Sequence, residues 1–96
     1  MPEIKPAQYD IPPQVRNTNG SDGGVVLDIR RNKVFRLNAT GALIFEELKN
    51  GRNVNEVSLE ISQKFNVAID VANNDVNEFV AAMLTNRLIK FAELSR

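Results

Sequence analysis

The side chains that most often perform catalysis or hold a metal ion are scarce in this sequence. Its 96 residues include no Cys and no His, which excludes thiolate nucleophiles, imidazole bases, disulfides and the zinc sites built on those ligands. Glu46 and Glu47 are adjacent on a predicted helix, so their side chains diverge by about 100°. Glu56 and Glu60 are followed by Lys64 at the next fourth position, a pattern typical of a solvated helix face with an ion pair.

Glycine and hydroxyl patterns give no stronger indication of a reactive site. Gly23 and Gly24 precede a predicted strand rather than a helix, so the pair lacks the context of a phosphate-binding loop. No Ser or Thr lies in a recognisable motif with a base. We therefore predict no catalytic residue, no metal site and no cofactor, and we expect a protein that is not an enzyme.

The composition is that of an ordinary globular domain, with 43% hydrophobic and 25% charged residues. Twelve cationic and twelve acidic side chains leave no net charge, which argues against a protein that coats nucleic acid or anionic lipid. No apolar run approaches the ~18 residues that a membrane span needs. The segment Met1–Asp10 lacks the apolar core of a signal peptide. The sequence thus predicts a cytoplasmic protein with no membrane segment and no nucleic-acid partner.

The chain divides into a single domain with two short tails. Residues 1–13 hold all four prolines and are predicted to form a disordered tail, because they offer little apolar surface to bury. Residues 14–90 form the predicted domain, and residues 91–96 a C-terminal tail. A short extended piece at residues 14–17 is expected to lead into a loop at residues 17–24, which are rich in Asn, Asp and Gly.

Residues 25–29 and 34–37 are rich in Val, Ile, Leu and Phe and predict a β-hairpin. A three-residue loop is preferred, because it pairs Ile29 with Phe35 and gathers the large apolar side chains on one face. A two-residue loop would pair Ile29 with Val34 and mix the two faces.

Three helices account for the rest of the domain. Asn38 is the predicted cap of the first helix, which ends at Gly51. Asn53 with Glu56 resembles a capping box for the second, and Asp70 is the predicted cap of the third and longest. The fold class is therefore α+β and winged helix-turn-helix-like, with an N-terminal β-hairpin, in one variant three strands, followed by three α-helices.

Charge and apolar surface are unevenly distributed along the domain. Residues 24–38 carry four cationic side chains against one acidic, whereas residues 66–87 carry three acidic against one cationic. The cations of the hairpin either protect an exposed edge strand against aggregation or dock an acidic extended peptide. The apolar stripe of the third helix is wider than one packing face needs. That stripe is either buried on both sides or forms part of an apolar groove.

Three segments stand out by their residues and by their order and spacing: LDIR at 27–30 with FRLNATGA at 35–42, NGRNVNEV at 50–57, and NDVNEFVAAML at 74–84. Together they resemble the PqqD-like family, and the resemblance covers roughly residues 15–89, most of the predicted domain. The resemblance implies a small winged helix-turn-helix domain, also called a RiPP recognition element. Such domains bind the leader segment of a ribosomally made precursor peptide and present it to a modifying enzyme, commonly a radical SAM enzyme. The sequence departs from the family at Arg87-Leu88, where Gly-Leu is frequent.

In that family the leader adds as a strand to the last strand of the hairpin and lies against the third helix. The resemblance therefore implies a peptide-binding site made of a receiving strand and a helical wall. The strand residues are Val34, Phe35, Arg36 and Leu37, and the helix residues are Asn77, Val80, Ala81 and Leu84.

The alternative is a winged-helix DNA-binding regulator with Arg30, Arg31 and Lys33 in the wing. Acidic side chains on the second and third helices and the zero net charge disfavour this alternative.

Overall fold

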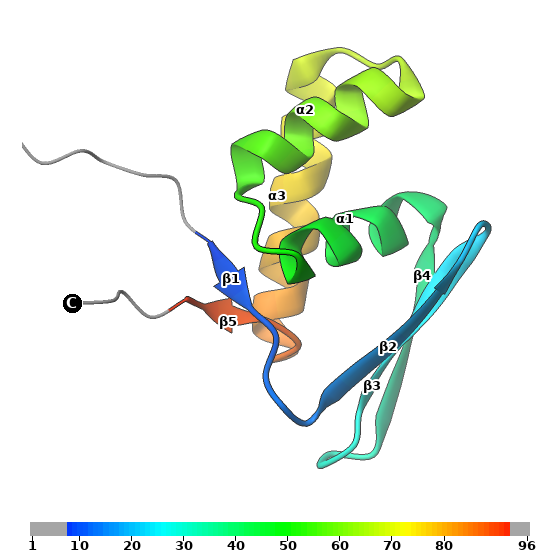
Figure 1. Ribbon diagram of the computed structural model, residues 1–96, viewed down its shortest axis with the longest axis vertical. Helices are drawn as coiled ribbons and strands as arrows, with labels where there is room; N and C mark the ends of the chain where they lie inside the picture. Colours follow the sequence, from blue (N-terminus) through cyan, green and yellow to red (C-terminus); the bar gives the residue numbers. More distant parts are fainter. Residues whose placement is uncertain (1–7, 93–96) are drawn as a thin grey trace, which may run out of the picture.

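A three-stranded antiparallel sheet followed by three helices forms the framework of the computed structural model, which describes residues 8–92 (Figure 1). The α+β class and the order of its elements are confirmed. No helix in residues 8–92 is both long and apolar enough to cross a membrane. In chain order the elements are β1 (Tyr9–Asp10), β2 (Val15–Gly20), β3 (Gly23–Asp28), β4 (Lys33–Asn38), α1 (Ala39–Lys49), α2 (Val54–Phe65), α3 (Ile69–Thr85) and β5 (Lys90–Phe91).

Strand β2 occupies much of the segment that the sequence predicts to be a loop. It pairs with β3 along its whole length, so the expectation of a loop at residues 17–24 is wrong. Polar side chains fasten this strand to α1: the Asn19 amide donates to the Glu46 carboxylate at 2.9 Å, and the Lys49 ammonium donates to the side-chain oxygen of Asn17 at 3.1 Å. These contacts span 27 and 32 residues of sequence, so local composition does not reveal them.

The β3–β4 hairpin has a register that differs from both predicted ones. Val26 pairs with Phe35, and residues 29–32 form a four-residue loop. The turn is held by Asp28, which is 1% exposed and accepts a hydrogen bond from the Arg31 amide at 3.1 Å. Because the outer face of this hairpin is also apolar, hydrophobic alternation alone selects the wrong pairing.

The predicted caps of α1 and α2 are confirmed. The side chain of Asn38 accepts from the Gly41 amide at 2.8 Å, and α1 is followed by Gly51 at φ +89°. Asn53 and Glu56 form a complete capping box, with bonds of 3.0 and 2.9 Å. Both caps satisfy main-chain donors that the first turn of a helix otherwise leaves without a partner.

The prediction that Asp70 caps α3 is wrong. The helix begins at Ile69, and the cap position is taken by Ala68, whose side chain makes no capping bond. Asp70 lies inside the first turn, where its charge interacts favourably with the helix dipole.

The core lies around α1, which packs against the sheet and against α2 and α3. Large side chains that are at most 1% exposed come from every layer. They are Val26, Ile44, Phe45, Leu48, Val57, Ile61, Val76 and Leu88. One helix therefore fixes the position of the sheet relative to the other two helices.

A second, two-stranded sheet joins β1 to β5, so the prediction of tails up to residue 13 and from residue 91 is wrong where the structure describes those residues. Tyr9 is 7% exposed, and its ring centroid lies 5.3 Å from that of Phe91. The Ala92 amide donates to the Gln8 carbonyl at 3.0 Å. The remaining tail residues, 1–7 and 93–96, lie outside the described chain.

Replacing Tyr9 with alanine is expected to lower the free energy of unfolding by about 2–3 kcal/mol, because a buried aromatic side chain is removed from the core. Urea denaturation followed by circular dichroism measures the change. The exposed neighbour Asp10 provides the control, and Asp10→Ala is expected to change stability by less than about 0.5 kcal/mol. Equal, small effects of the two substitutions would mean that β1 does not belong to the cooperative core.

Candidate functional site

Strand β4 lies at one edge of the three-stranded sheet, with β3 as its only neighbour in that sheet. The Ile29 amide donates to the Gln14 carbonyl at 3.0 Å and thereby continues the β2–β3 ladder. Bonded and non-bonded pairs alternate along an antiparallel ladder. Residues 23, 25 and 27 of β3 therefore bond to β2, and residues 24, 26 and 28 bond to β4.

The free edge of β4 is consequently formed by the main chain of Val34 and Arg36. The residues that bond β3 are their neighbours in sequence, Phe35 and Leu37. These two neighbours are half-buried on the side of α1, whereas the Val34 side chain is 64% exposed on the opposite face. The edge thus presents unpaired donors and acceptors beside a partly apolar inner surface.

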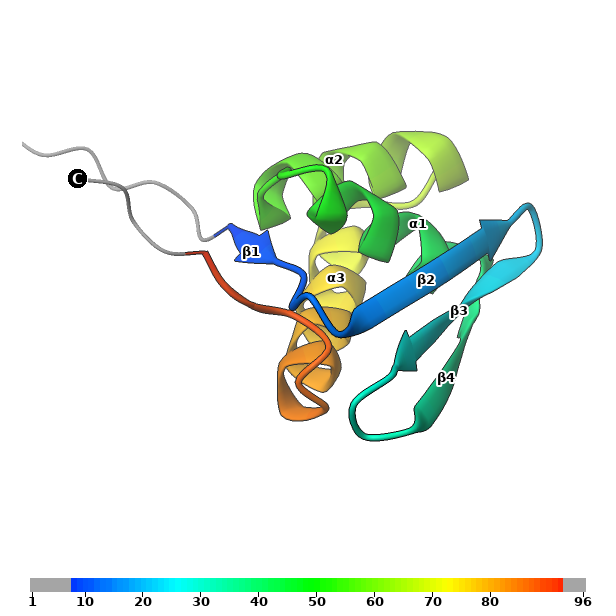
Figure 2. The same ribbon diagram turned by 60° about the horizontal axis from the view of Figure 1, so that its bottom comes forward.

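A hollow of about 390 Å³ lies at the end of this edge, between β4, the first turn of α1 and α3. Helix α1 packs against both β4 and α3 and therefore lies between them at the base of the hollow (Figure 2). The absence of a side chain at Gly41 matters here, since a Cβ atom would lie 3.1 Å from the Phe79 ring. The residues that line the hollow are Asn38, Thr40, Gly41, Ile44, Asp75, Glu78 and Phe79.

The structure does not bring the predicted helical wall to this hollow. None of Asn77, Val80, Ala81 and Leu84 lines it. At about 100° per residue, three of them project roughly 140–160° around α3 from Phe79. The fourth, Val80, is 6% exposed and belongs to the core. The predicted strand residues 34–37 do not line the hollow either: β4 reaches it through Asn38 at its end, and α3 reaches it through Asp75, Glu78 and Phe79.

The site predicted from the sequence did not include Phe79, Asp75 or Glu78. A stripe of apolar positions shows which side of a helix is buried, but not which flank of that stripe faces a given strand. One signal was present: Gly41 stands in the first turn of α1, where a missing side chain permits the close approach of a ring from another helix.

The two sides of the groove between β4 and α3 differ in charge. The helix side carries Asp75 and Glu78, whereas the strand has no acidic side chain: its cations are Lys33, at the end of β4 away from the hollow, and Arg36, which faces outward with Val34. An extended chain added to β4 would direct alternate side chains inward, toward the apolar and acidic hollow, and outward, past Val34 and Arg36. Main-chain hydrogen bonds would hold such a chain, and the hollow would select its side chains.

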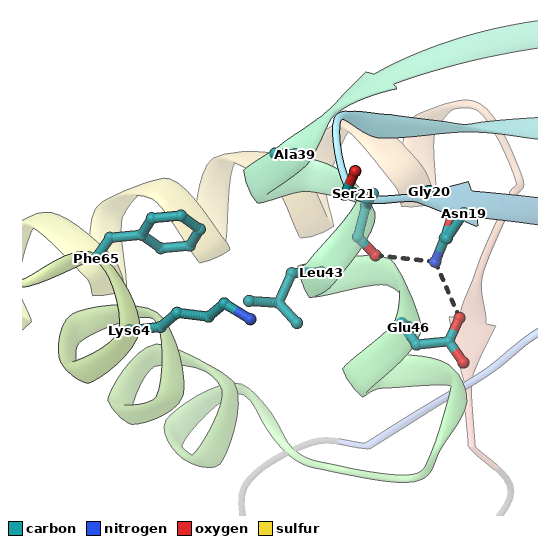
Figure 3. A pocket seen from close by; sticks show the side chains of 9 residues that line it. Asn19, Gly20, Ser21, Ala39, Leu43, Glu46, Lys64 and Phe65 are labelled. Carbon is teal, nitrogen blue, oxygen red and sulfur yellow. Dashed lines mark hydrogen bonds between the residues drawn. The ribbon is translucent and has the colours of Figure 1, made fainter.

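A second hollow of about 300 Å³ lies on roughly the opposite face of α1 (Figure 3). Leu43 points into it, and Lys64, Phe65 and Glu46 surround it (Figure 3). The Asn19 amide bridges Glu46 and the Ala42 carbonyl, at 2.9 and 3.3 Å. Within residues 8–92 no group of three His, Cys, Asp or Glu side chains is placed to hold a metal ion.

Together, the fold and the groove define a small α+β domain that offers an open edge strand to an extended chain. The family model described as coenzyme PQQ synthesis protein D (PqqD) matches residues 23–89. The chain belongs to the PqqD family, which confirms the resemblance seen in its motifs. Among curated proteins, none matches the chain.

Solved structures share this fold. A lasso peptide synthetase B1 complexed with the leader peptide is 25% identical, with a TM-score of 0.79, and covers 88% of this chain and 99% of its own. TbiB1 in complex with the TbiA(beta) leader peptide has the same TM-score and coverage at 24% identity. The PqqD truncation of Methylobacterium extorquens PqqCD, described as a functional, stand-alone RiPP recognition element, is 14% identical with a TM-score of 0.70, covering 85% of this chain and 87% of its own.

Proposed function

We propose that this protein is a non-catalytic recognition module that binds the leader segment of a ribosomally made precursor peptide and presents it to a modifying enzyme. The observation that carries the proposal is the free main chain of Val34 and Arg36 on β4, the strand whose last residue, Asn38, borders the hollow that Phe79 lines. Two solved structures of the same fold are described as complexes with a leader peptide. The leader is proposed to add to β4 as a fourth strand.

The side chains proposed to recognise the leader come from both sides of the groove. Phe35 and Leu37 supply an apolar surface on the strand, and Phe79 supplies one on the helix. Asp75 and Glu78 favour a polar or cationic leader side chain at the end of the groove, since they leave negative charge there. The same two carboxylates repel phosphate and so disfavour the placement of DNA along this flank of α3.

The partner is proposed to be an enzyme of the radical SAM class, which commonly accompanies members of this family. The interaction takes place, in this proposal, in the cytoplasm, where the ribosome makes the precursor peptide. No step of the modification is assigned to the module itself.

An amide NMR titration of the isotope-labelled protein tests this function. The probe is a synthetic leader peptide encoded by a short open reading frame beside the gene for this protein. Saturable shifts are expected at residues 34–37 and at residues 75–79, and none is expected along β2. Absence of shifts with the leader, combined with shifts at residues 30–33 on addition of duplex DNA, would replace the proposal by the regulator alternative.

A further inference from the structure

The outer face of the three-stranded sheet is apolar and uncovered by any described element. The helices lie on one side of the sheet, as Figure 2 shows. Val26, which is 0% exposed, faces that side, and the opposite side remains open. On that open side Leu27, Ile29 and Val34 are 36%, 59% and 64% exposed, and Val25 lies beside them in the pleat. We call these four residues and the cations around them the outer sheet face.

Cationic side chains surround this apolar patch. The register places Arg16 across β3 from Val34, on either side of Leu27, and Arg36 in the next row beside Val25. Arg30 stands in the β3–β4 loop, whereas Lys33 pairs with the buried Asp28 and so lies on the inner side of the sheet. Between residues 15 and 38 the only two acidic residues are elsewhere: Asp22 lies in the β2–β3 turn, and Asp28 is buried on the inner side.

This combination of charge and apolar surface restricts what can cover the outer sheet face. A second copy of the chain would bring cations against cations, which disfavours self-association through this face. A nucleic acid would meet an apolar centre that offers phosphate no partner. A folded protein with an apolar patch rimmed by carboxylates complements the face in both respects.

We propose, on the basis of the proposed function, that the outer sheet face is the docking surface for the modifying enzyme. The enzyme would contribute an apolar patch that is rimmed by its own Asp and Glu side chains. A leader added to β4 points its outward side chains along this same face, beside Val34 and Arg36. An enzyme that docks here therefore contacts the module and its bound leader together. The groove holds the peptide, and the outer face positions the enzyme over it.

Two variants test the docking surface without altering the groove. Arg16→Glu reverses a charge on β2, two strands away from the leader edge, and the pair Leu27→Thr with Ile29→Thr removes apolar surface while keeping strand-forming residues. Lys64→Glu, an exposed position on α2, is the control for charge reversal. Leader affinity is measured by fluorescence anisotropy with the synthetic peptide. Enzyme affinity is measured by calorimetry with the modifying enzyme encoded beside the gene, at low and high salt.

Both outer-face variants are expected to weaken enzyme binding at least about tenfold, a loss typical of well-packed interface residues, while leader affinity and the Lys64→Glu control stay within about twofold. Wild-type affinity for the enzyme is expected to fall with salt, because the cations contribute to it. Unchanged enzyme binding by both outer-face variants, no binding of the enzyme to the leader-loaded wild type, or a dimer formed through this face would overturn the proposal. If the wild-type protein did not bind the leader peptide, the proposed function itself would be overturned.

Discussion

Replacing Val34 with proline is expected to weaken leader binding by about 10- to 100-fold while leaving the domain folded. The outward amide of Val34 is one of the donors that an added strand would use, and a hydrogen bond of this kind contributes about 0.5–1.5 kcal/mol. The proline ring also blocks the close approach of the incoming chain. Fluorescence anisotropy with the synthetic leader measures the loss, and circular dichroism verifies the fold.

Two further substitutions make this prediction specific to the main chain. Val34→Thr keeps the amide and the strand propensity, so its affinity for the leader is expected to stay within about threefold of the wild type. Phe35→Pro removes an amide that bonds β3, so it is expected to lower the free energy of unfolding by about 1–3 kcal/mol. A folded Val34→Pro variant that binds the leader as tightly as the wild type would exclude strand addition at β4.

The largest loss of stability is expected for Phe45→Ala, at about 3–5 kcal/mol. Phe45 is fully buried on α1, the helix that joins the sheet to α2 and α3. A cavity at this position weakens both sides of the core at once. This loss is a large part of the free energy of unfolding, which is commonly about 5–15 kcal/mol. Urea denaturation measures it.

Phe65→Ala is the matched control, because Phe65 is 40% exposed at the end of α2. Its loss is expected to be below about 1 kcal/mol. If the two phenylalanines proved equally important to stability, α1 would not be the centre of the core. At temperatures where both variants remain folded, their affinities for the leader are expected to match that of the wild type, since neither ring lines the groove.

The helices and their caps were predictable because their signals are local. Asn38 caps α1, and Asn53 with Glu56 caps α2, through contacts three residues apart, so sequence spacing contains the information. The cap of α3 is the exception, since Ala68 leaves no side-chain signal at all. The motifs of the family likewise lie in residues that the family model matches.

The sheet was harder to predict, because its pairing depends on contacts between distant residues. β2 is polar, and Asn19 connects it to Glu46 of α1. In β1, Tyr9 packs against the ring of Phe91, which lies 82 positions later in the sequence. The prediction of the hairpin register was wrong for a different reason: Leu27 and Val34 face outward although both are apolar. On α3, the apolar stripe indicates which side of the helix is buried but does not indicate that Phe79, rather than one of the predicted residues, lines the hollow.

The pairing of β1 with β5 places the two ends of the described chain next to each other, with Tyr9 opposite Phe91. Both strands lie away from the three-stranded sheet (Figure 1). A second polypeptide can therefore be fused at either end without approaching β4 or the outer sheet face. A short flexible tether to an enzyme would hold the two at an effective concentration on the order of millimolar. Covalent fusion could thus replace a weak docking contact and leave leader recognition unchanged.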